Sequence, residues 1–165
     1  MIGLYAGSFD PPTLGHLDII QRAAAVCERL VVGVGSNPEK SSSFSLEERV
    51  RLLRLECTDL DNVAVDVITG ATVAYAREHG ITVLIRGLRT YFDLVHERAM
   101  AEVNRTNGFE SLFLMTTGTV AHVSSSIVRQ ALAAGLSLDG LVTPRIDRAL
   151  REGPGAAATD PGVHG

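Results

Sequence analysis

The segment Gly7-Ser8-Phe9-Asp10-Pro11-Pro12-Thr13-Leu14-Gly15-His16 decides the fold of this 165-residue chain. It follows the apolar run 2–6, which has the length of a strand, and its Gly, Asp and Pro residues end that strand sharply. A helical pattern then opens near Gly15, because apolar side chains recur at spacings of three and four at Leu17, Ile20, Ala24 and Cys27. Gly15 and His16 therefore fall in a first helical turn, where free backbone N–H groups and the helix dipole form an anion site.

A phosphate is the ligand that this junction favours. Glycine lets a phosphate approach the backbone closely, and His16 can donate a ring N–H to a phosphate oxygen. For any one residue, turn chemistry favours the alternative of a strand end, a simple turn and a surface histidine. The ordered set reverses that balance, since G-S-F-D-P-x-T-x-G-H resembles the signature of the T/H-x-G-H nucleotidyltransferase superfamily, with Thr13, Gly15 and His16 as its T-x-G-H.

Composition is that of one compact domain, which we place at residues 1–151, and we expect the Gly-, Pro- and Ala-rich residues 152–165 to form a flexible tail. A formal charge of -4 argues against nucleic acid as a partner, so anion binding must be local. No apolar stretch approaches the roughly 18 residues of a membrane span, so no membrane partner is expected. Cys27 and Cys57 lie in helical patterns away from any metal-ligand spacing, which predicts a packing role in a reduced, cytoplasmic protein.

Short apolar strands alternate with helical patterns along the whole chain. Strands are predicted at 2–6, 30–35, 63–67, 82–85 and 111–115, and helices at 46–56, 72–79, 91–105 and after the serines 124–126. This alternation predicts an α/β fold, a Rossmann-like five-stranded parallel sheet of the nucleotidyltransferase type with helices on both faces. Because ligands of such sheets bind at the carboxyl ends of the strands, we expect the polar clusters that follow the strands to share one cleft.

Two of those clusters carry groups suited to phosphate. Arg86 and Arg89 flank Gly87 after an apolar strand, and arginine suits bidentate phosphate recognition. The alternative is that both pair with the surface carboxylates of Asp93 and Glu97. In the triple serine, Ser124 is placed as a helix N-cap, which leaves two hydroxyls, those of Ser125 and Ser126, near the helix N-terminus. Lys40, in the loop 36–44, is by itself an ordinary solvated lysine.

Taken together these clusters resemble one family, bacterial phosphopantetheine adenylyltransferase, from Met1 to about Arg151. The matching motifs, in order and spacing, are G-S-F-D-P-x-T-x-G-H, N-P-x-K at 37–40, L-E-E-R-V at 46–50, R-G-L-R at 86–89, N-R at 104–105 and V-S-S-S at 123–126. The resemblance implies a cytoplasmic hexamer that uses Mg²⁺ and transfers the AMP of ATP to 4'-phosphopantetheine, giving dephospho-coenzyme A and pyrophosphate. No general base is required, because a phosphate monoester is largely doubly ionised at neutral pH.

The resemblance also implies roles for single residues. The catalytic set is His16, Lys40, Arg86 and Ser8. The nucleotide set is Gly7, Ser8, Phe9, Gly15, His16, Gly87, Arg89, Asp93, Glu97, Ser124, Ser125 and Ser126. The acceptor set is Ser8, Lys40, Thr72, Arg86 and Asn104, and Mg²⁺ is expected to be held mainly by the nucleotide phosphates rather than by protein ligands.

Departures from the family pattern keep other functions open. Ala71-Thr72 replaces an apolar pair beneath the pantetheine arm, 93–97 lacks the family's aromatic residues, Val120-Ala121-His122 replaces an aromatic pair, and Ala6 replaces a proline. One alternative is a diverged nucleotidyltransferase with another phosphorylated acceptor. Nicotinate-nucleotide adenylyltransferases share the opening motif, but they usually have His where Thr13 stands and lack R-G-L-R. A non-catalytic nucleotide-binding subunit is disfavoured because His16, Lys40 and Arg86 are all present.

Overall fold

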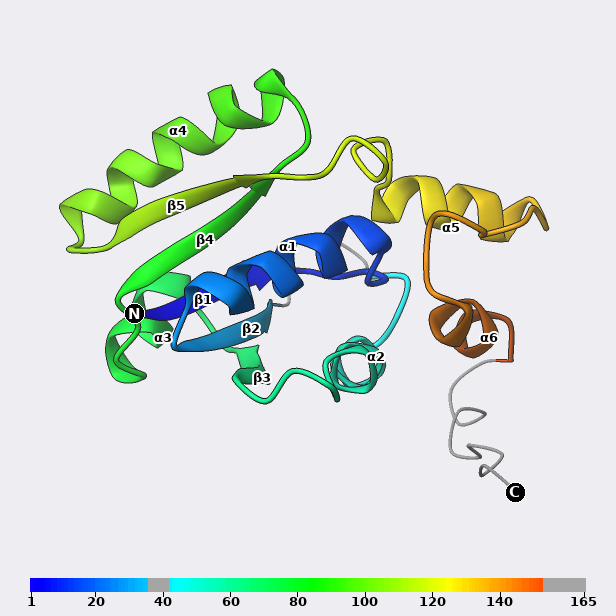
Figure 1. Ribbon diagram of the computed structural model, residues 1–165, viewed down its shortest axis with the longest axis horizontal. Helices are drawn as coiled ribbons and strands as arrows, with labels where there is room; N and C mark the ends of the chain where they lie inside the picture. The colour runs from blue at the N-terminus through cyan, green and yellow to red at the C-terminus, as the bar shows by residue number, and fades with distance from the viewer. Residues whose placement is uncertain (36–41, 153–165) are drawn as a thin grey trace.

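The computed structural model describes residues 1–35 and 42–152 (Figure 1). Five parallel strands form one sheet in the order β3-β2-β1-β4-β5, with bounds β1 Ile2–Gly7, β2 Arg29–Gly35, β3 Val63–Ile68, β4 Val83–Leu88 and β5 Glu110–Met115. The helices are α1 Leu14–Val26, α2 Leu46–Glu56, α3 Thr72–Glu78, α4 Tyr91–Thr106, α5 Ser125–Ala133 and α6 Pro144–Glu152. The predicted Rossmann-like sheet is confirmed.

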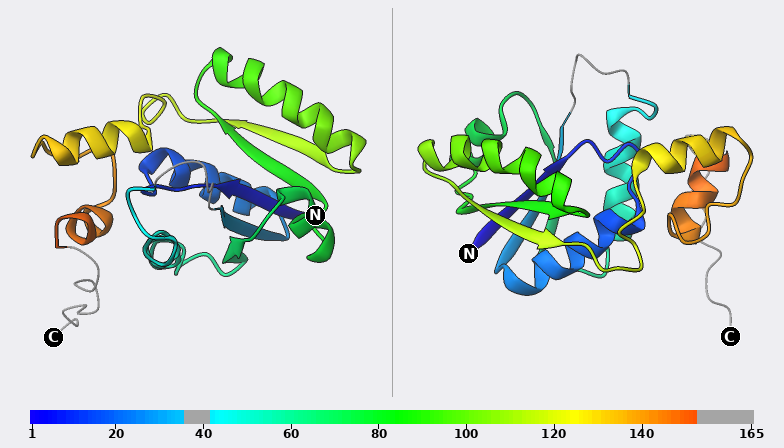
Figure 2. Two further views of the ribbon diagram at one scale, coloured as in Figure 1. Left: turned by 180° about the vertical axis from the view of Figure 1, so that it is seen from behind. Right: turned by 90° about the horizontal axis from the view of Figure 1, so that it is seen from above.

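Alternate side chains of the central strands enter two different cores. Tyr5 and Val32 pack with α1 and α2 on one face of the sheet. Leu4 and Val31 pack with Tyr75 of α3 on the other face. Because side chains along a strand alternate between faces, the near-continuous apolar runs of β1 and β2 are what a sheet covered on both sides requires. The helices on either side are visible in Figure 2.

The helix starts read from the sequence are confirmed. Thr13 caps α1 and Ser45 caps α2. In each case the side-chain oxygen accepts the backbone N–H of the residue three positions later. Cys27 and Cys57 stand at the C-terminal caps of these two helices, where both are buried and free, which confirms their packing role.

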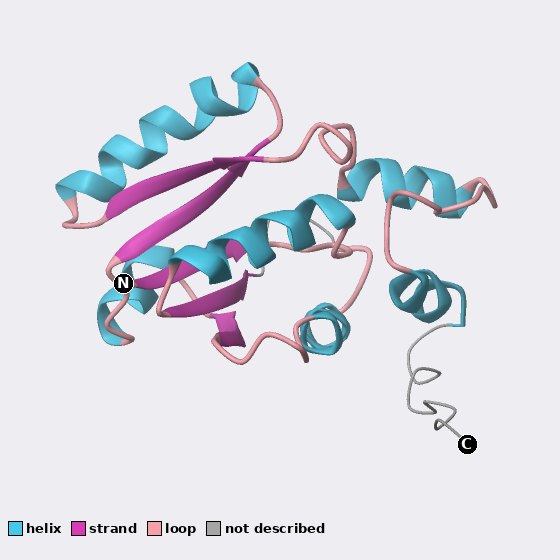
Figure 3. Cartoon of the chain, in the orientation of Figure 1, coloured by secondary structure: helices cyan, strands magenta, loops and turns pink. Residues whose placement is uncertain are grey.

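Two parts of the architecture differ from the prediction. β4 runs to Leu88 instead of ending at Ile85, because residues 86–88 pair with 113–115 of β5, so Arg86 and Gly87 lie within the strand rather than after it. Helix α6 was not predicted; it packs with α5 and α2 around Leu52, Val128 and Ile146, beside the sheet (Figure 3). Residues 153–165 of the expected tail lie outside the described residues, and Glu152 ends α6.

Helix α4 is covered on little of its surface. Asn104 is the one buried residue among its 16, all of which are described. Large apolar side chains stand exposed along it at Tyr91, Phe92, Leu94, Val95, Met100 and Val103. Within the described ranges, none of the helices has the length and apolarity needed to cross a membrane.

Close packing at Gly33 gives a test of this fold. A Cβ at Gly33 would lie 2.3 Å from Cδ1 of Ile68 and 3.0 Å from Cδ1 of Leu4, both buried. We expect Gly33→Ala to lower the free energy of unfolding by about 1–3 kcal/mol through overpacking, as measured by urea denaturation. Gly118→Ala is the control, since no atom lies within 4 Å of its added Cβ; equal losses in the two variants would contradict this packing.

Candidate active site

A cavity of about 520 Å³ opens beside the carboxyl end of β1 and is lined by residues of α1 and α5 among others. Several predicted site residues line it: Ser8, Gly15, His16, Gly87, Arg89, Ser124, Ser125 and Ser126. Others were not predicted, namely Tyr5, Asp10, Thr13, Ile19, Ser42, Thr116, Val123 and Arg129. The structure therefore gathers residues from β1, α1, β4 and α5 around one hollow, and most are polar.

A reciprocal pair of hydrogen bonds fixes the first turn of α1. The backbone N–H of Thr13 donates to Nδ1 of His16 over 3.1 Å, and the backbone N–H of His16 donates to Oγ1 of Thr13 over 3.4 Å. Because Nδ1 accepts, the neutral ring carries its proton on Nε2. The Phe9 ring meets the imidazole edge-on, with centroids 5.0 Å apart, and holds its plane.

The His16 ring is neutral at pH 7. Burial, followed by the positive charge of Arg89, lowers the pKa of His16 from 6.5 to about 4. An uncharged donor of this kind can hydrogen-bond a phosphate oxygen at any pH above that value. The sequence pointed to this donor, but only the structure gives its tautomer.

The serines at the start of α5 do different jobs. Ser124 caps the helix by accepting the N–H of Ile127 over 3.3 Å, as predicted. Ser125 donates its hydroxyl proton to the carbonyl of Pro11 over 2.8 Å, so that proton is already used. Ser126 accepts from Nη2 of Arg129 over 3.2 Å, which leaves its own proton free for an anion. The backbone N–H groups of this first turn add further donors.

Arg129 is a cation of the cavity that the sequence reading missed. It follows Ser126 by three residues, which places both on one face of α5. Its guanidinium lies 3.8 Å from the Asp10 carboxylate and donates to the Asp10 carbonyl. The helical spacing from the serines was the signal that could have found it.

Arg86, within β4, and Arg89, directly after it, each pair with a carboxylate of α4. Arg86 makes a bidentate pair with Glu97 over 2.8 and 2.6 Å and donates to the Ala6 carbonyl over 3.0 Å. The Arg89 side chain lies 3.3 Å from Asp93. The ion-pair alternative thus describes both arginines, and Asp93 and Glu97 hold these arginines instead of lining the cavity.

A second cavity of about 230 Å³ lies on the opposite face of the sheet. Its lining comprises Leu4, Ala6, Thr72, Leu84, Ile85, Arg86, Met100 and Asn104. Tyr5 faces the first cavity while its neighbours Leu4 and Ala6 face the second, because side chains alternate along β1. The first cavity thus gathers most of the polar clusters that were expected to share one cleft, while Arg86 of the 86–89 cluster lines the second cavity.

The remaining predicted residues are placed as follows. Thr72, Arg86 and Asn104, three of the predicted acceptor residues, share the second cavity. Gly7 and Phe9 line neither cavity. The Phe9 side chain is 1% exposed and packs against the His16 ring. Lys40 lies in 36–41, outside the described residues. Across 1–35 and 42–152, no group of three or more His, Cys, Asp or Glu gathers as a metal site.

Comparison with known proteins supports the same class of chemistry. The sequence profile of the cytidylyltransferase-like family matches residues 4–131. Proteins named phosphopantetheine adenylyltransferase are similar over nearly the whole chain. The protein from Synechocystis is 47% identical over 149 residues, covering 88% of this chain and 93% of its own. The protein from Geotalea daltonii is 42% identical over 151 residues, covering 90% and 94%.

The fold is also shared with solved structures of low sequence identity. A proposed nicotinate-nucleotide adenylyltransferase from Vibrio parahaemolyticus superposes with a TM-score of 0.70 at 16% identity, covering 92% of this chain and 91% of its own. At that identity the likeness concerns the fold alone.

The state of His16 can be measured directly. In ¹⁵N spectra of the imidazole we expect the Nε2–H tautomer at pH 7 and a protonation midpoint near 4, with His16→Gln providing the assignment. Between pH 6.5 and 4 the unfolded chain would bind a proton that the folded protein does not, so this group lowers stability as the pH falls through that window. A midpoint at or above 6.5, or a protonated Nδ1, would contradict the assignment.

Proposed function

Because this chain belongs to the phosphopantetheine adenylyltransferases of the cytidylyltransferase-like family, we propose that it transfers AMP from ATP to 4'-phosphopantetheine, giving dephospho-coenzyme A and pyrophosphate. One observation carries the proposal: β1 lies between a polar cavity that contains His16, Arg89 and Arg129 and a smaller cavity with apolar walls and one arginine. Two substrates could then approach the carboxyl end of β1 from opposite faces of the sheet.

The first cavity suits a nucleoside triphosphate. It offers the neutral His16 donor, the guanidiniums of Arg89 and Arg129, the free proton of Ser126, and the N-termini of α1 and α5. These groups come from both sides of the hollow, so a triphosphate can run from His16 towards α5. We assign the cavity to ATP on that basis.

The second cavity suits the acceptor. Leu4, Leu84 and Met100 supply apolar wall, while Asn104 and Thr72 supply polar groups that can pair with the amides of a linear arm. Arg86 is the cation of this cavity, and we assign the acceptor phosphate to it. Where the resemblance leads us to expect a larger apolar pair at 71–72, Ala71 stands at the N-cap position of α3 without a side-chain cap, and Thr72 brings a hydroxyl to the cavity lining.

The reaction follows from charge and alignment. An oxygen of the acceptor phosphate attacks the α-phosphorus of ATP, forming the new P–O bond as the bond to the β-phosphate oxygen breaks and pyrophosphate leaves. Nε2–H of His16 donates to a non-bridging α-phosphate oxygen, whose charge grows in the transition state. Arg129, Ser126 and the start of α5 hold the departing pyrophosphate, and Lys40 is assigned, by family resemblance, to aligning the phosphates.

We propose that Mg²⁺ enters with ATP, bound mainly by its phosphates. The described residues provide no cluster of three or more acidic, His or Cys side chains to hold it, and the carboxylate in the first cavity, that of Asp10, already accepts hydrogen bonds from Ser43 and Phe44. When bound, the ion would neutralise triphosphate charge. We also propose a cytoplasmic location, which is supported by the two cysteines, since both are buried and neither forms a disulfide.

The test of the function is a substrate screen. The purified protein with Mg²⁺ and ATP should release pyrophosphate and form dephospho-coenzyme A, identified by mass, when 4'-phosphopantetheine is supplied. Nicotinate mononucleotide and other phosphorylated acceptors serve as competitors. Turnover with one of these and none with 4'-phosphopantetheine would overturn the assignment in favour of a diverged acceptor.

The exposed apolar face of α4 supports a homo-oligomer, which we propose to be the hexamer of the family. Tyr91 and Phe92 are 73% and 74% exposed, an unusual exposure for adjacent aromatic residues. We expect sedimentation velocity to give a multiple of 17.6 kDa and Phe92→Asp to lower it. Leu136→Asp, at an exposed apolar residue away from α4, is the control; a monomeric wild-type protein would contradict the proposal.

Loss of the His16 donor should affect the chemical step more than binding. We expect His16→Ala to lower kcat by about 100-fold or more while the Kd for ATP changes little, since the donor acts on transition-state charge. Stopped-flow or steady-state kinetics with calorimetry of ATP binding measures both. Glu78→Ala, at an exposed position of α3 that lines neither cavity, should behave as wild type; an unchanged kcat in His16→Ala would remove His16 from the mechanism.

The acceptor cavity predicts a different kinetic signature. Asn104→Leu keeps the volume of a 7% exposed side chain but removes its amide, so we expect the KM for 4'-phosphopantetheine to rise roughly tenfold with the Kd for ATP unchanged. Ser111→Ala is a matched control, because it removes the 3.3 Å hydrogen bond from Asn104 without altering the lining. If ATP affinity falls instead, the two cavities are assigned the wrong way round.

A further inference from the structure

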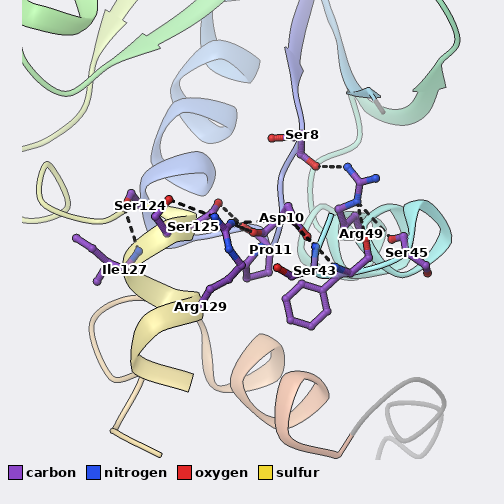
Figure 4. Close-up of polar contacts among 12 residues, drawn as sticks. Ser8, Asp10, Pro11, Ser43, Ser45, Arg49, Ser124, Ser125, Ile127 and Arg129 are labelled. Carbon is purple, nitrogen blue, oxygen red and sulfur yellow. Dashed lines mark hydrogen bonds and ion pairs between the residues drawn. The ribbon is translucent and has the colours of Figure 1, made fainter. Parts of the chain in front are cut away.

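Asp10, at the edge of the cavity that we assign to ATP, contacts residues 43–44 before α2 and Arg129 of α5 (Figure 4). One carboxylate oxygen accepts the N–H of Ser43 and the other accepts the N–H of Phe44, each over 2.9 Å. The same carboxylate lies 3.8 Å from Nη1 of Arg129 on α5, and its side chain is 11% exposed. The buried Asp10 carboxylate thus interacts both with the backbone just before α2 and with the Arg129 side chain of α5.

The backbone around Asp10 is fixed from both sides as well. Arg129 donates to the Asp10 carbonyl, and Ser125 donates to the Pro11 carbonyl over 2.8 Å. From α2, the buried Arg49 donates to the Ser8 carbonyl over 2.6 Å and to the Gly35 carbonyl over 3.1 Å. The carboxylate is therefore held on a segment that cannot easily shift, so it can serve as a fixed reference for the groups around it.

We propose that Asp10 is a positioning residue for adenylyl transfer, which acts on ATP through Arg129. Its carboxylate draws the guanidinium to the wall of the cavity, where Nη1 and Nη2 are oriented by the Asp10 carbonyl and by Ser126. A guanidinium has five N–H groups, so others stay available for phosphate oxygens. The Arg129–Asp10 ion pair, at 3.8 Å, orients the guanidinium. It is not a bidentate pair, which would use two of the N–H groups at once.

The chemistry of the site requires a carboxylate. Two backbone N–H groups point at two different oxygens of Asp10. An asparagine could accept from one of them, but its NH₂ group would face the other donor, and the charge that attracts Arg129 would be gone. Asp10→Asn therefore removes the positioning interaction while keeping the size of the side chain.

This inference rests on the proposed use of the first cavity for ATP, and a double-mutant cycle tests it. The variants are Asp10→Asn, Arg129→Ala and the two combined, each measured for the Kd of ATP by calorimetry and for kcat with 4'-phosphopantetheine. We expect Asp10→Asn to weaken ATP binding about tenfold in the wild-type background. In the Arg129→Ala background we expect it to add little, because the group it positions is absent.

Ser45→Ala is the matched control for stability. It removes the cap of α2 next to the same loop but touches neither cavity, so it should lower Tm while leaving Kd and kcat at wild-type values. Additive effects of Asp10→Asn and Arg129→Ala, or wild-type ATP affinity in Asp10→Asn, would overturn the proposal. Should Asp10→Asn not fold, the same cycle run with Asp10→Glu, which keeps the charge but displaces it by one methylene, gives the decision.

The readouts separate this proposal from the proposed function. A wild-type protein that binds ATP but does not adenylylate 4'-phosphopantetheine contradicts the acceptor assignment, while the ATP cycle still decides the role of Asp10. A wild-type protein that is active, with an additive cycle, contradicts the role of Asp10 alone.

Discussion

The reciprocal hydrogen bonds between Thr13 and His16 are the constraint on which the site depends. They start α1 at the carboxyl end of β1, and they leave Nε2–H of a neutral imidazole as the group offered to the cavity. A helix cap and the orientation of the candidate catalytic donor are thus one interaction. Because the donor is set by backbone geometry, it needs no rearrangement when a phosphate arrives, which is how preorganised electrostatic stabilisation works.

Each of the three arginines that we assign to a phosphate has a carboxylate beside it. Arg86 pairs with Glu97, Arg89 with Asp93, and Arg129 with Asp10. These pairs keep the arginines in place and limit their mutual repulsion before substrate binds. Binding of phosphates then adds hydrogen bonds to groups that are already oriented, so less side-chain entropy is lost.

Local patterns were enough to predict most of the fold. The apolar run 2–6, the breakers after it and the spacing from Leu17 onward give β1 and α1, and alternation along the chain gives the parallel sheet. The extension of β4 was missed because Arg86 and Gly87 interrupt the apolar run, while their pairing partners in β5, Phe113 and Leu114, lie far along the chain. Helix α6 was missed although the sequence carries its signals, since Thr143 and Pro144 stand at its start and Ile146, Ala149 and Leu150 recur at helical spacing. These three side chains pack with α2 and α5.

The sequence predicted which types of residue form the site, but not how they are arranged in space. Residue types near strand ends indicated phosphate binding at His16, Arg89 and the serines, and the cavity contains them. The division into two hollows follows from the alternation of β1 side chains across the sheet, and that becomes visible only once the helices on each face are placed. Asp10 read as part of a turn, because its partners at 43–44 and 129 are distant in sequence.

We propose that the nucleotide and the acceptor meet at the end of β1 from opposite faces of the sheet, with His16 at the α-phosphate. A crystal structure with a non-hydrolysable ATP analogue and 4'-phosphopantetheine tests it most directly. We expect an α-phosphate oxygen about 3 Å from Nε2 of His16, the terminal phosphates against α5, and the pantetheine arm beside Asn104. A nucleotide seated in the cavity of Asn104, or an α-phosphate out of reach of His16, would contradict it.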